Sequence, residues 1–234
     1  MKHVVCYSGG HSSAIVAIEV SRKYGNTDLV LLNHDMAAHV EDADIKRFKH
    51  EVAAYIGVPV TYANRGDGTE DQFDVCIQSK GFKGGNNVLC TTRLKTEPFW
   101  KWLKDNVPDK NCVCYYGFDV NEKHRVTRRV GIMANRGYKT DYPLLWTERT
   151  IHSTKEIGIE PPLTYSTFKH ANCIGCLKAG WQHWYVVYCT RKDIWKKAKN
   201  AEEEIGHAIH KDAHGLPVYL VERERVLANA ESRN

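Results

Sequence analysis

The chain has 234 residues, a formal net charge of +5 and an apolar share of 42%. This length suits one domain, or one domain with an appendage, and the apolar share is enough for a hydrophobic core. No stretch approaches the ~20 apolar residues that cross a bilayer, and a single N-terminal lysine before a short apolar run is unlike a signal peptide. We therefore expect a cytoplasmic protein with no membrane partner. The small positive charge is compatible with a nucleic-acid partner without requiring one.

Apolar runs and helical periods alternate through the first half of the chain. We expect strands over residues 3–8, 29–32, 60–63 and 112–117, and helices over about 12–24, 42–56, 92–106 and 121–135. The polar, glycine-rich stretch 65–87 predicts a long working loop. Alternating strands and helices with apolar strands are typical of an α/β, Rossmann-like fold, in which helices cover both faces of a parallel sheet.

The pattern changes after Tyr142-Pro143-Leu144. Short helical pieces follow, then a Cys-x-x-Cys sequence, then a helical region rich in tryptophan from about 179 to 199. We expect an α/β nucleotide-binding domain over 1–145. A mostly helical C-terminal extension over 146–234 is expected to pack on it and carry the Cys-x-x-Cys. The tryptophans and tyrosines of this region recur at near-helical spacing and predict packing in its core.

A loop of serines and glycines separates the first strand from the first helix. It reads Ser8-Gly9-Gly10-His11-Ser12-Ser13. Glycines let backbone amides approach a phosphate, and the N-terminus of the following helix adds partial positive charge. Ligands of open α/β sheets bind at the carboxyl ends of the strands, where this loop lies. It is neither a Walker A loop nor a GxGxxG motif, and a tight turn with a serine N-cap is the simpler alternative.

Eight cysteines are many for a protein of a reducing compartment, where a disulfide framework is not expected. Cys6 reads as a core residue of the first strand, because free cysteine packs as a small apolar side chain. Among the eight, only Cys173 and Cys176 have the spacing of metal ligands or of a redox pair. A turn with two structural thiols and no metal remains open.

Several motifs, in the same order along residues 1 to about 185, resemble those of one superfamily. The loop Ser8–Ser13 is similar to the SGGxDS loop of the PP-loop ATP pyrophosphatases, and the chain looks most like their phosphoadenosine phosphosulfate (PAPS) reductase branch. Three further stretches carry the likeness: Asn33-His34-Asp35, Cys90-Thr-Thr-Arg-Leu-Lys95 with Glu97-Pro98, and Gly117-Phe-Asp-Val-Asn-Glu122 with Arg125. Asn172-Cys173-Ile-Gly-Cys176 resembles the branch's late Gly-Cys-x-x-Cys.

The resemblance implies a bound adenine nucleotide, ATP or a close relative, with magnesium. The loop Ser8, Gly9, Gly10, His11, Ser12 and Ser13 would hold its phosphates, and Asn33, Asp35 and Gly117 would complete the nucleotide site. Lys95, Arg125 and Arg128 would stabilise charge during catalysis. The family's usual aspartate is Ser12 here, which leaves Asp35 or Asp119 as substitute carboxylates.

The resemblance also implies a metal group on Cys90, Cys173 and Cys176. Iron–sulfur members of the branch use two adjacent cysteines and a later Cys-x-x-Cys, but Thr91 stands at the second position of the pair. Three thiolates suit a [4Fe–4S] cluster with one open iron, as in some tRNA-thiolating relatives. They also suit zinc with His170 or His183 as fourth ligand, and we place the cluster ahead of zinc.

The implied activity is adenylylation of an acceptor with release of pyrophosphate, for sulfur transfer to a nucleic acid or a small molecule. One alternative is sulfonucleotide (PAPS) reduction. The reductases use a cysteine in a C-terminal tail, and no cysteine follows Cys189 here, so we place reduction second. A second alternative is a non-catalytic module that binds adenine nucleotides. The acceptor and the formation of a homodimer stay open.

Overall fold

The computed structural model describes residues 1–168 and 170–231 and divides into two compact units. The first unit comprises residues 1–35, 42–64 and 98–171, and the second comprises 36–41, 65–97 and the chain from Asn172 onward. Each unit is assembled from separate stretches, so no single point in the chain divides them. Among the described residues, no helix is both long enough and apolar enough to cross a membrane.

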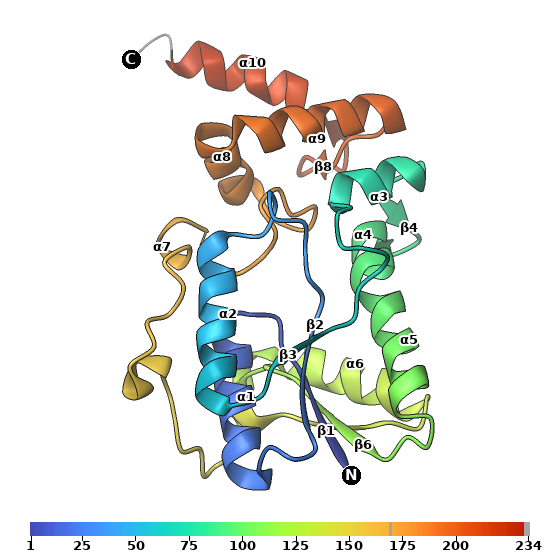
Figure 1. Ribbon diagram of the computed structural model, residues 1–234. Helices are drawn as coiled ribbons and strands as arrows, with labels where there is room; N and C mark the ends of the chain where they lie inside the picture. The colour runs from blue at the N-terminus through green and yellow to red at the C-terminus, as the bar shows by residue number, and fades with distance from the viewer. Residues whose placement is uncertain (169, 232–234) are drawn as a thin grey trace. The chain divides into compact units, whose positions relative to one another are not determined.

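Five parallel strands form the sheet of the first unit, in the order β3–β2–β1–β6–β7 (Figure 1). The strands are β1 (Lys2–Cys6), β2 (Leu29–Asn33), β3 (Val60–Tyr62), β6 (Cys112–Tyr115) and β7 (Lys139–Asp141). β1 lies at the centre, where Val5 is in register with Leu31 of β2 and with Tyr115 of β6. The expected α/β class with a parallel sheet is therefore confirmed, and β7 is a strand that the sequence did not predict.

Helices cover both faces of this sheet (Figure 1). Val5 packs in a cluster with side chains of α1 (His11–Tyr24) and α2 (Ala43–Ile56). Its neighbour Val4 packs in a separate cluster with side chains of α5 (Glu97–Asn106) and α6 (Lys123–Ala134). Because successive side chains of a strand point to opposite faces, burial of both valines requires a helical layer on each side.

Short helical pieces complete the first unit. They are η2 (Val120–Glu122), η3 (Pro143–Leu145), η4 (Thr154–Ile157) and α7 (Tyr165–Phe168).

The long helices begin and end close to their expected bounds. In α2, Asp42 caps the N-terminus by accepting a hydrogen bond from the backbone N–H of Asp44, and Gly57 ends the helix in the left-handed conformation.

The second unit is mostly helical. It contains α3 (Gln72–Gln78), α4 (Leu89–Thr91), a π-helical turn η1 (Thr92–Thr96), α8 (Trp181–Thr190), α9 (Lys192–Ile205) and α10 (Leu220–Glu231). Two hairpins, β4 (Lys83–Gly84) with β5 (Asn87–Val88) and β8 (His210–Lys211) with β9 (Pro217–Val218), complete it. The expectation of a loop over 65–87 was wrong, because a capping box at Asp71 starts α3 inside that stretch.

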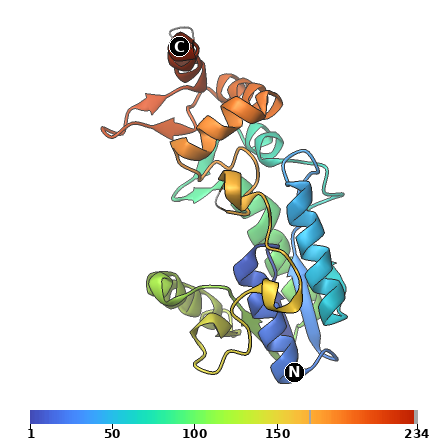
Figure 2. The same ribbon diagram turned by 90° about the vertical axis from the view of Figure 1, so that its left-hand side faces the viewer.

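Aromatic side chains of α8 and α9 form the centre of the C-terminal helical region, drawn in orange and red in Figure 2. Trp184 and Trp195 are almost completely buried, and their rings meet edge to face with centroids 6.2 Å apart. Tyr188 packs on Trp195 in the same way. Trp184, Tyr188 and Trp195 pack as the sequence predicted, whereas Tyr185 of α8 is exposed.

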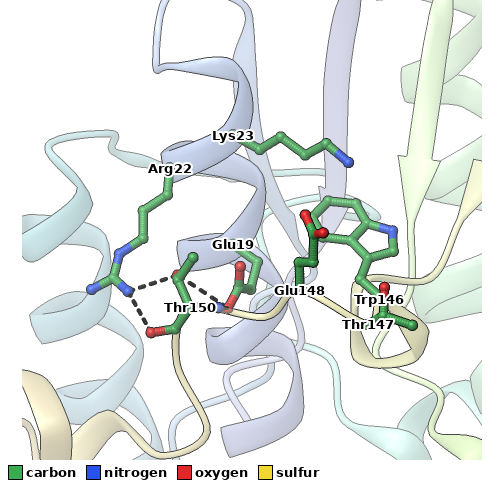
Figure 3. Close-up of a pocket in the computed structure, with 7 residues that line it drawn as sticks. All are labelled: Glu19, Arg22, Lys23, Trp146, Thr147, Glu148 and Thr150. Atoms are coloured by element: carbon green, nitrogen blue, oxygen red, sulfur yellow. Dashed lines mark hydrogen bonds between the residues drawn. The ribbon is translucent and has the colours of Figure 1, made fainter.

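Glu19 of α1 holds the chain that follows η3. Its side chain is 2% exposed, and its Oε1 atom accepts hydrogen bonds from the backbone N–H groups of Thr150 at 2.6 Å and Ile151 at 2.8 Å. Figure 3 shows Glu19 pointing toward Thr150, which also accepts hydrogen bonds from Arg22. One buried carboxylate therefore fixes this segment on α1.

We predict that Glu19→Leu lowers the free energy of unfolding, because two backbone amides lose their acceptor. An orphaned buried donor costs about 1–3 kcal/mol, and urea titration followed by circular dichroism measures the change. Glu148→Leu is the control, since Glu148 lies nearby but is exposed. Equal stabilities of the two variants would contradict the role given to Glu19.

Candidate functional site

The loop after β1 has a backbone that depends on glycine. Gly9 adopts a φ of +80°, and a Cβ atom there would lie 3.2 Å from Cγ2 of Ile45, so a side chain is disfavoured both by conformation and by space. The Ser13 hydroxyl donates to the Gly10 carbonyl at 2.8 Å, and the Ser8 hydroxyl donates to Ser13 Oγ at 3.2 Å. These bonds hold a compact turn.

The same loop forms the N-terminus of α1. Gly10 is the N-cap and has no side chain to cap the helix, and the first turn carries no acidic residue, so the partial positive charge of the helix end is not offset there. The His11 N–H donates to the hydroxyl of Tyr165 at 2.8 Å. Burial raises the pKa of Tyr165. The uncharged Tyr165 hydroxyl therefore already accepts from one of the backbone N–H groups at this helix end.

The loop lies where the order in which the chain adds strands to the sheet reverses. From β1 the chain builds β2 and β3 on one side and later returns to build β6 and β7 on the other. Gly117, just after β6, packs so closely that a Cβ atom would lie 3.2 Å from the backbone carbonyl carbon of Ser12. Two of the expected segments thus meet at this topological switch point, which is where ligands of open α/β sheets bind.

The end of β2 carries Asn33 and Asp35, both expected at a nucleotide site. Asn33 is 3% exposed; its Nδ2 donates to the Tyr7 carbonyl at 2.5 Å, and its Oδ1 accepts from Lys49 at 3.2 Å. Asp35 is partly exposed and pairs with Lys46 at 3.1 Å. The structure therefore gives Asn33 a role in joining β2 to β1, while Asp35 reaches the surface.

Lys46 and Lys49 are site neighbours that sequence reasoning missed. Both belong to α2, and Lys49 is completely buried, with its Cδ atom 3.4 Å from the Cβ position at Gly9. Two lysines three residues apart share one helix face, but the same spacing is common on solvated helices. The spacing of the two lysines was visible in the sequence, but it could not be distinguished from that of lysines on a solvated helix.

The basic helix α6 presents arginines to an aromatic group after β6. The Arg125 guanidinium pairs with Glu122 and lies 4.2 Å from the centroid of the Phe118 ring. Arg129, one turn later, lies over the ring of Tyr116. Arg128, which the sequence favoured, is exposed. Arg129 was missed, although its spacing of four from Arg125 places both on one helix face.

The three expected cysteines and Lys95 all belong to the second unit. Charge on Cys173, Cys176, Cys90 and Glu41 raises the pKa of Lys95, with Cys173 the largest contributor. Burial raises the pKa of the Cys173 thiol, and Lys95 opposes that rise. Lys95 lies in the π-helical turn η1, a rare geometry that is frequent at functional sites. The lysine expected to stabilise phosphate charge is thus a neighbour of thiols.

The turn that carries Cys173 and Cys176 is braced by a histidine. Nε2 of His183 accepts hydrogen bonds from the backbone N–H groups of Gly175 at 3.0 Å and Cys176 at 3.2 Å. An Nε2 that accepts has its lone pair engaged, so the proton of a neutral ring is on Nδ1. His183 is therefore a structural acceptor here, which counts against it as a zinc ligand. His170, the other candidate, belongs to the first unit.

The donor set on the second unit fits a metal group in its chemistry. Thiolates are soft ligands that suit zinc or an iron–sulfur cluster. Within residues 1–168 and 170–231, no three or more His, Cys, Asp or Glu side chains lie at the spacing that one metal ion requires. A four-iron cluster is wider than one ion, so its ligands do not need that spacing.

A pocket of about 400 Å³ lies elsewhere, along the C-terminal half of α1. Figure 3 shows Trp146 and Glu148 on one side of it and Arg22 with Lys23 on the α1 side. The Lys23 amine lies 4.0 Å from the centroid of the Trp146 ring. The Ser8–Ser13 loop is at the opposite end of α1, so this pocket is not the site that the motifs indicate.

Comparison with known proteins adds no identification: no family model matches the chain, and no curated protein sequence matches it.

We predict that His183→Leu loosens the turn, because two amides lose their acceptor. The thiols of Cys173 and Cys176 should then react severalfold faster with a chromogenic disulfide reagent under native conditions. His207→Leu is the control, since His207 is an exposed histidine of the same unit. If His183→Leu leaves the thiol reaction rates unchanged, the bracing role is excluded.

Proposed function

We propose that the chain is an adenylylating enzyme of the PP-loop type, which binds ATP at Ser8–Ser13 and transfers the adenylyl group to an acceptor for later sulfur transfer. The position of the loop carries the proposal. It joins the central strand to α1 at the switch point of a parallel sheet, and Gly117 packs on it from the neighbouring strand. Backbone amides at such a position are suited to phosphate oxygens.

The chemistry is a substitution at the α-phosphorus of ATP. An oxygen of the acceptor forms a bond to this phosphorus, the bond to the bridging oxygen breaks, and pyrophosphate leaves. The loop amides and nearby cations stabilise the charge that develops on the phosphate oxygens. Among the cations, Arg125 and Arg129 lie after β6 and Lys46 lies on α2. No step of this proposal requires the metal group.

A nucleic acid is the acceptor class that we favour. α6 carries Arg125, Arg128 and Arg129 within five residues, and the first two are exposed. Guanidinium groups on an exposed helix suit phosphate contacts, which position a nucleic acid without reading its sequence. A small-molecule acceptor would not need this helix.

We predict that Gly10→Val weakens ATP binding at least tenfold, about 1.4 kcal/mol. A Cβ at this position would lie 3.1 Å from the Tyr165 hydroxyl and 3.4 Å from Cβ of Ala171, so a branched side chain must displace the loop. Isothermal titration calorimetry with ATP measures the effect.

Gly131→Val is the matched control for this variant. Gly131 lies in α6, and a Cβ there would meet no atom within 4 Å, so only local helix propensity changes. Unchanged ATP affinity in a folded Gly10→Val protein would remove the loop from the nucleotide site.

We predict that ATP yields pyrophosphate only when an acceptor is present, because a site that adenylylates water would waste ATP. The assay offers ATP with total tRNA, duplex DNA or neither, and measures pyrophosphate. A parallel reaction offers PAPS with a thiol reductant and measures sulfite. Sulfite from PAPS without pyrophosphate from ATP would reverse the ranking and favour the reductase. Tight ATP binding with neither product would favour a nucleotide-binding module.

A further inference from the structure

A strap of the first unit, residues 150–168, contacts α1 at both of its ends. It includes η4 and α7 and is drawn in yellow to orange in Figure 1. Its first residues are held by Glu19, in the C-terminal half of α1. Further along, the Thr154 N–H donates to Nε2 of His11 at 3.3 Å. The strap then reaches the N-terminus of α1 through the hydroxyl of Tyr165. A segment outside every motif thus meets the glycine-serine loop.

Buried contacts keep the strap in place. Ile151 is completely buried in the cluster that α1 and α2 form with the sheet. Thr164, the neighbour of Tyr165, is 8% exposed. The Leu163 N–H donates to Oδ2 of Asp44 in α2 at 2.5 Å, a bond that the charge of the carboxylate strengthens. The strap is therefore a fixed part of the first unit, and it holds Tyr165 in a defined place.

The loop has a glycine where the phenol of Tyr165 approaches. A Cβ atom on Gly10 would lie 3.1 Å from the Tyr165 hydroxyl oxygen, so any other residue would press against it. The absence of a side chain at Gly10 therefore lets the hydroxyl come within hydrogen-bond distance of the first backbone N–H of α1.

The Tyr165 hydroxyl still has a hydrogen to donate. Its oxygen accepts from the His11 N–H at 2.8 Å, and nothing in the part of the chain that the structure describes accepts its proton. Burial raises the pKa of Tyr165, so the phenol keeps that proton and is a donor. An accepted N–H bond also makes a hydroxyl a stronger donor, because hydrogen bonds in a chain polarise one another.

We propose that Tyr165 is a phosphate-binding residue of the Ser8–Ser13 loop. The His11 N–H donates to the phenol oxygen, and the phenol donates its proton to a phosphate oxygen of the ligand. The hydroxyl thus extends the row of donors at the helix end, where an anion is favoured. The ligand class is a polyphosphate, free or as part of ATP. The inference rests on the proposed function in that a phosphate must bind at this loop, but it does not require adenylyl transfer.

The test measures how tightly the full chain binds ATP and inorganic tripolyphosphate, by isothermal titration calorimetry. Tyr165→Phe keeps the ring and removes only the hydroxyl. We expect the dissociation constants of both ligands to rise about fivefold or more, because a charged phosphate oxygen loses a donor. Binding is not abolished, because the backbone amides of the loop remain.

Tyr55→Phe is the matched control. The Tyr55 hydroxyl also accepts a hydrogen bond from α1, from Arg22 at 3.2 Å, but at the far end of that helix from the loop. This variant should bind both ligands as the wild type does. Thermal unfolding followed by circular dichroism checks that both variants fold. An equal loss of affinity in the two variants would contradict a phosphate contact at Tyr165.

Three further results would overturn the inference. Unchanged affinity in a folded Tyr165→Phe protein would make the hydroxyl only a cap of α1. Tighter binding would show that the hydroxyl competes with phosphate for the His11 N–H. A wild type that binds neither ligand would remove both the inference and the proposed function. By contrast, binding that weakens in Tyr165→Phe, in a protein that releases no pyrophosphate with any acceptor, would support the inference and overturn the proposed function.

Discussion

The burial of β1 on both faces is the constraint on which the first unit depends. Val4 and Val5 are neighbours in the chain and both are fully buried, so one helical layer must cover each side of this strand. β1 then has to lie inside the sheet, with β2 on one side and β6 on the other. Its carboxyl end falls where the two halves of the sheet diverge, and the Ser8–Ser13 loop follows that end directly.

A buried carboxylate has the corresponding role in the second unit. Burial of Asp71 opposes its ionisation, but hydrogen bonds from Lys197 and His39 hold its pKa below the usual value. As an anion it caps α3 and ties that helix to α9. This anchor also places the rest of α3, including the buried Cys76.

The fold and the loop could be predicted from sequence because their signals are local. Apolar strands and helical periods lie within windows of about 5–15 residues, and a glycine-serine turn between them is contiguous. The strand β7 was not predicted because its three residues, Lys139–Asp141, are polar and give no apolar run. His183 is a residue type that commonly binds metals, and only the structure shows that it accepts hydrogen bonds from two backbone N–H groups instead.

The missing loop aspartate changes how a triphosphate would be neutralised. Ser12 brings no charge, and the two carboxylates that could replace it are already engaged. Asp119 caps η2 through the backbone N–H of Asn121, and Asp35 pairs with Lys46. Recruiting either to magnesium would break an existing contact, at a cost that the metal bond must exceed. Lys46 is the other partner of the Asp35 pair, so a phosphate that took Lys46 would break the same contact but would give the lysine a new anion. In the proposed ATP complex, Lys46 of α2 and Arg125 of α6 are therefore cations that the first unit offers for the phosphates.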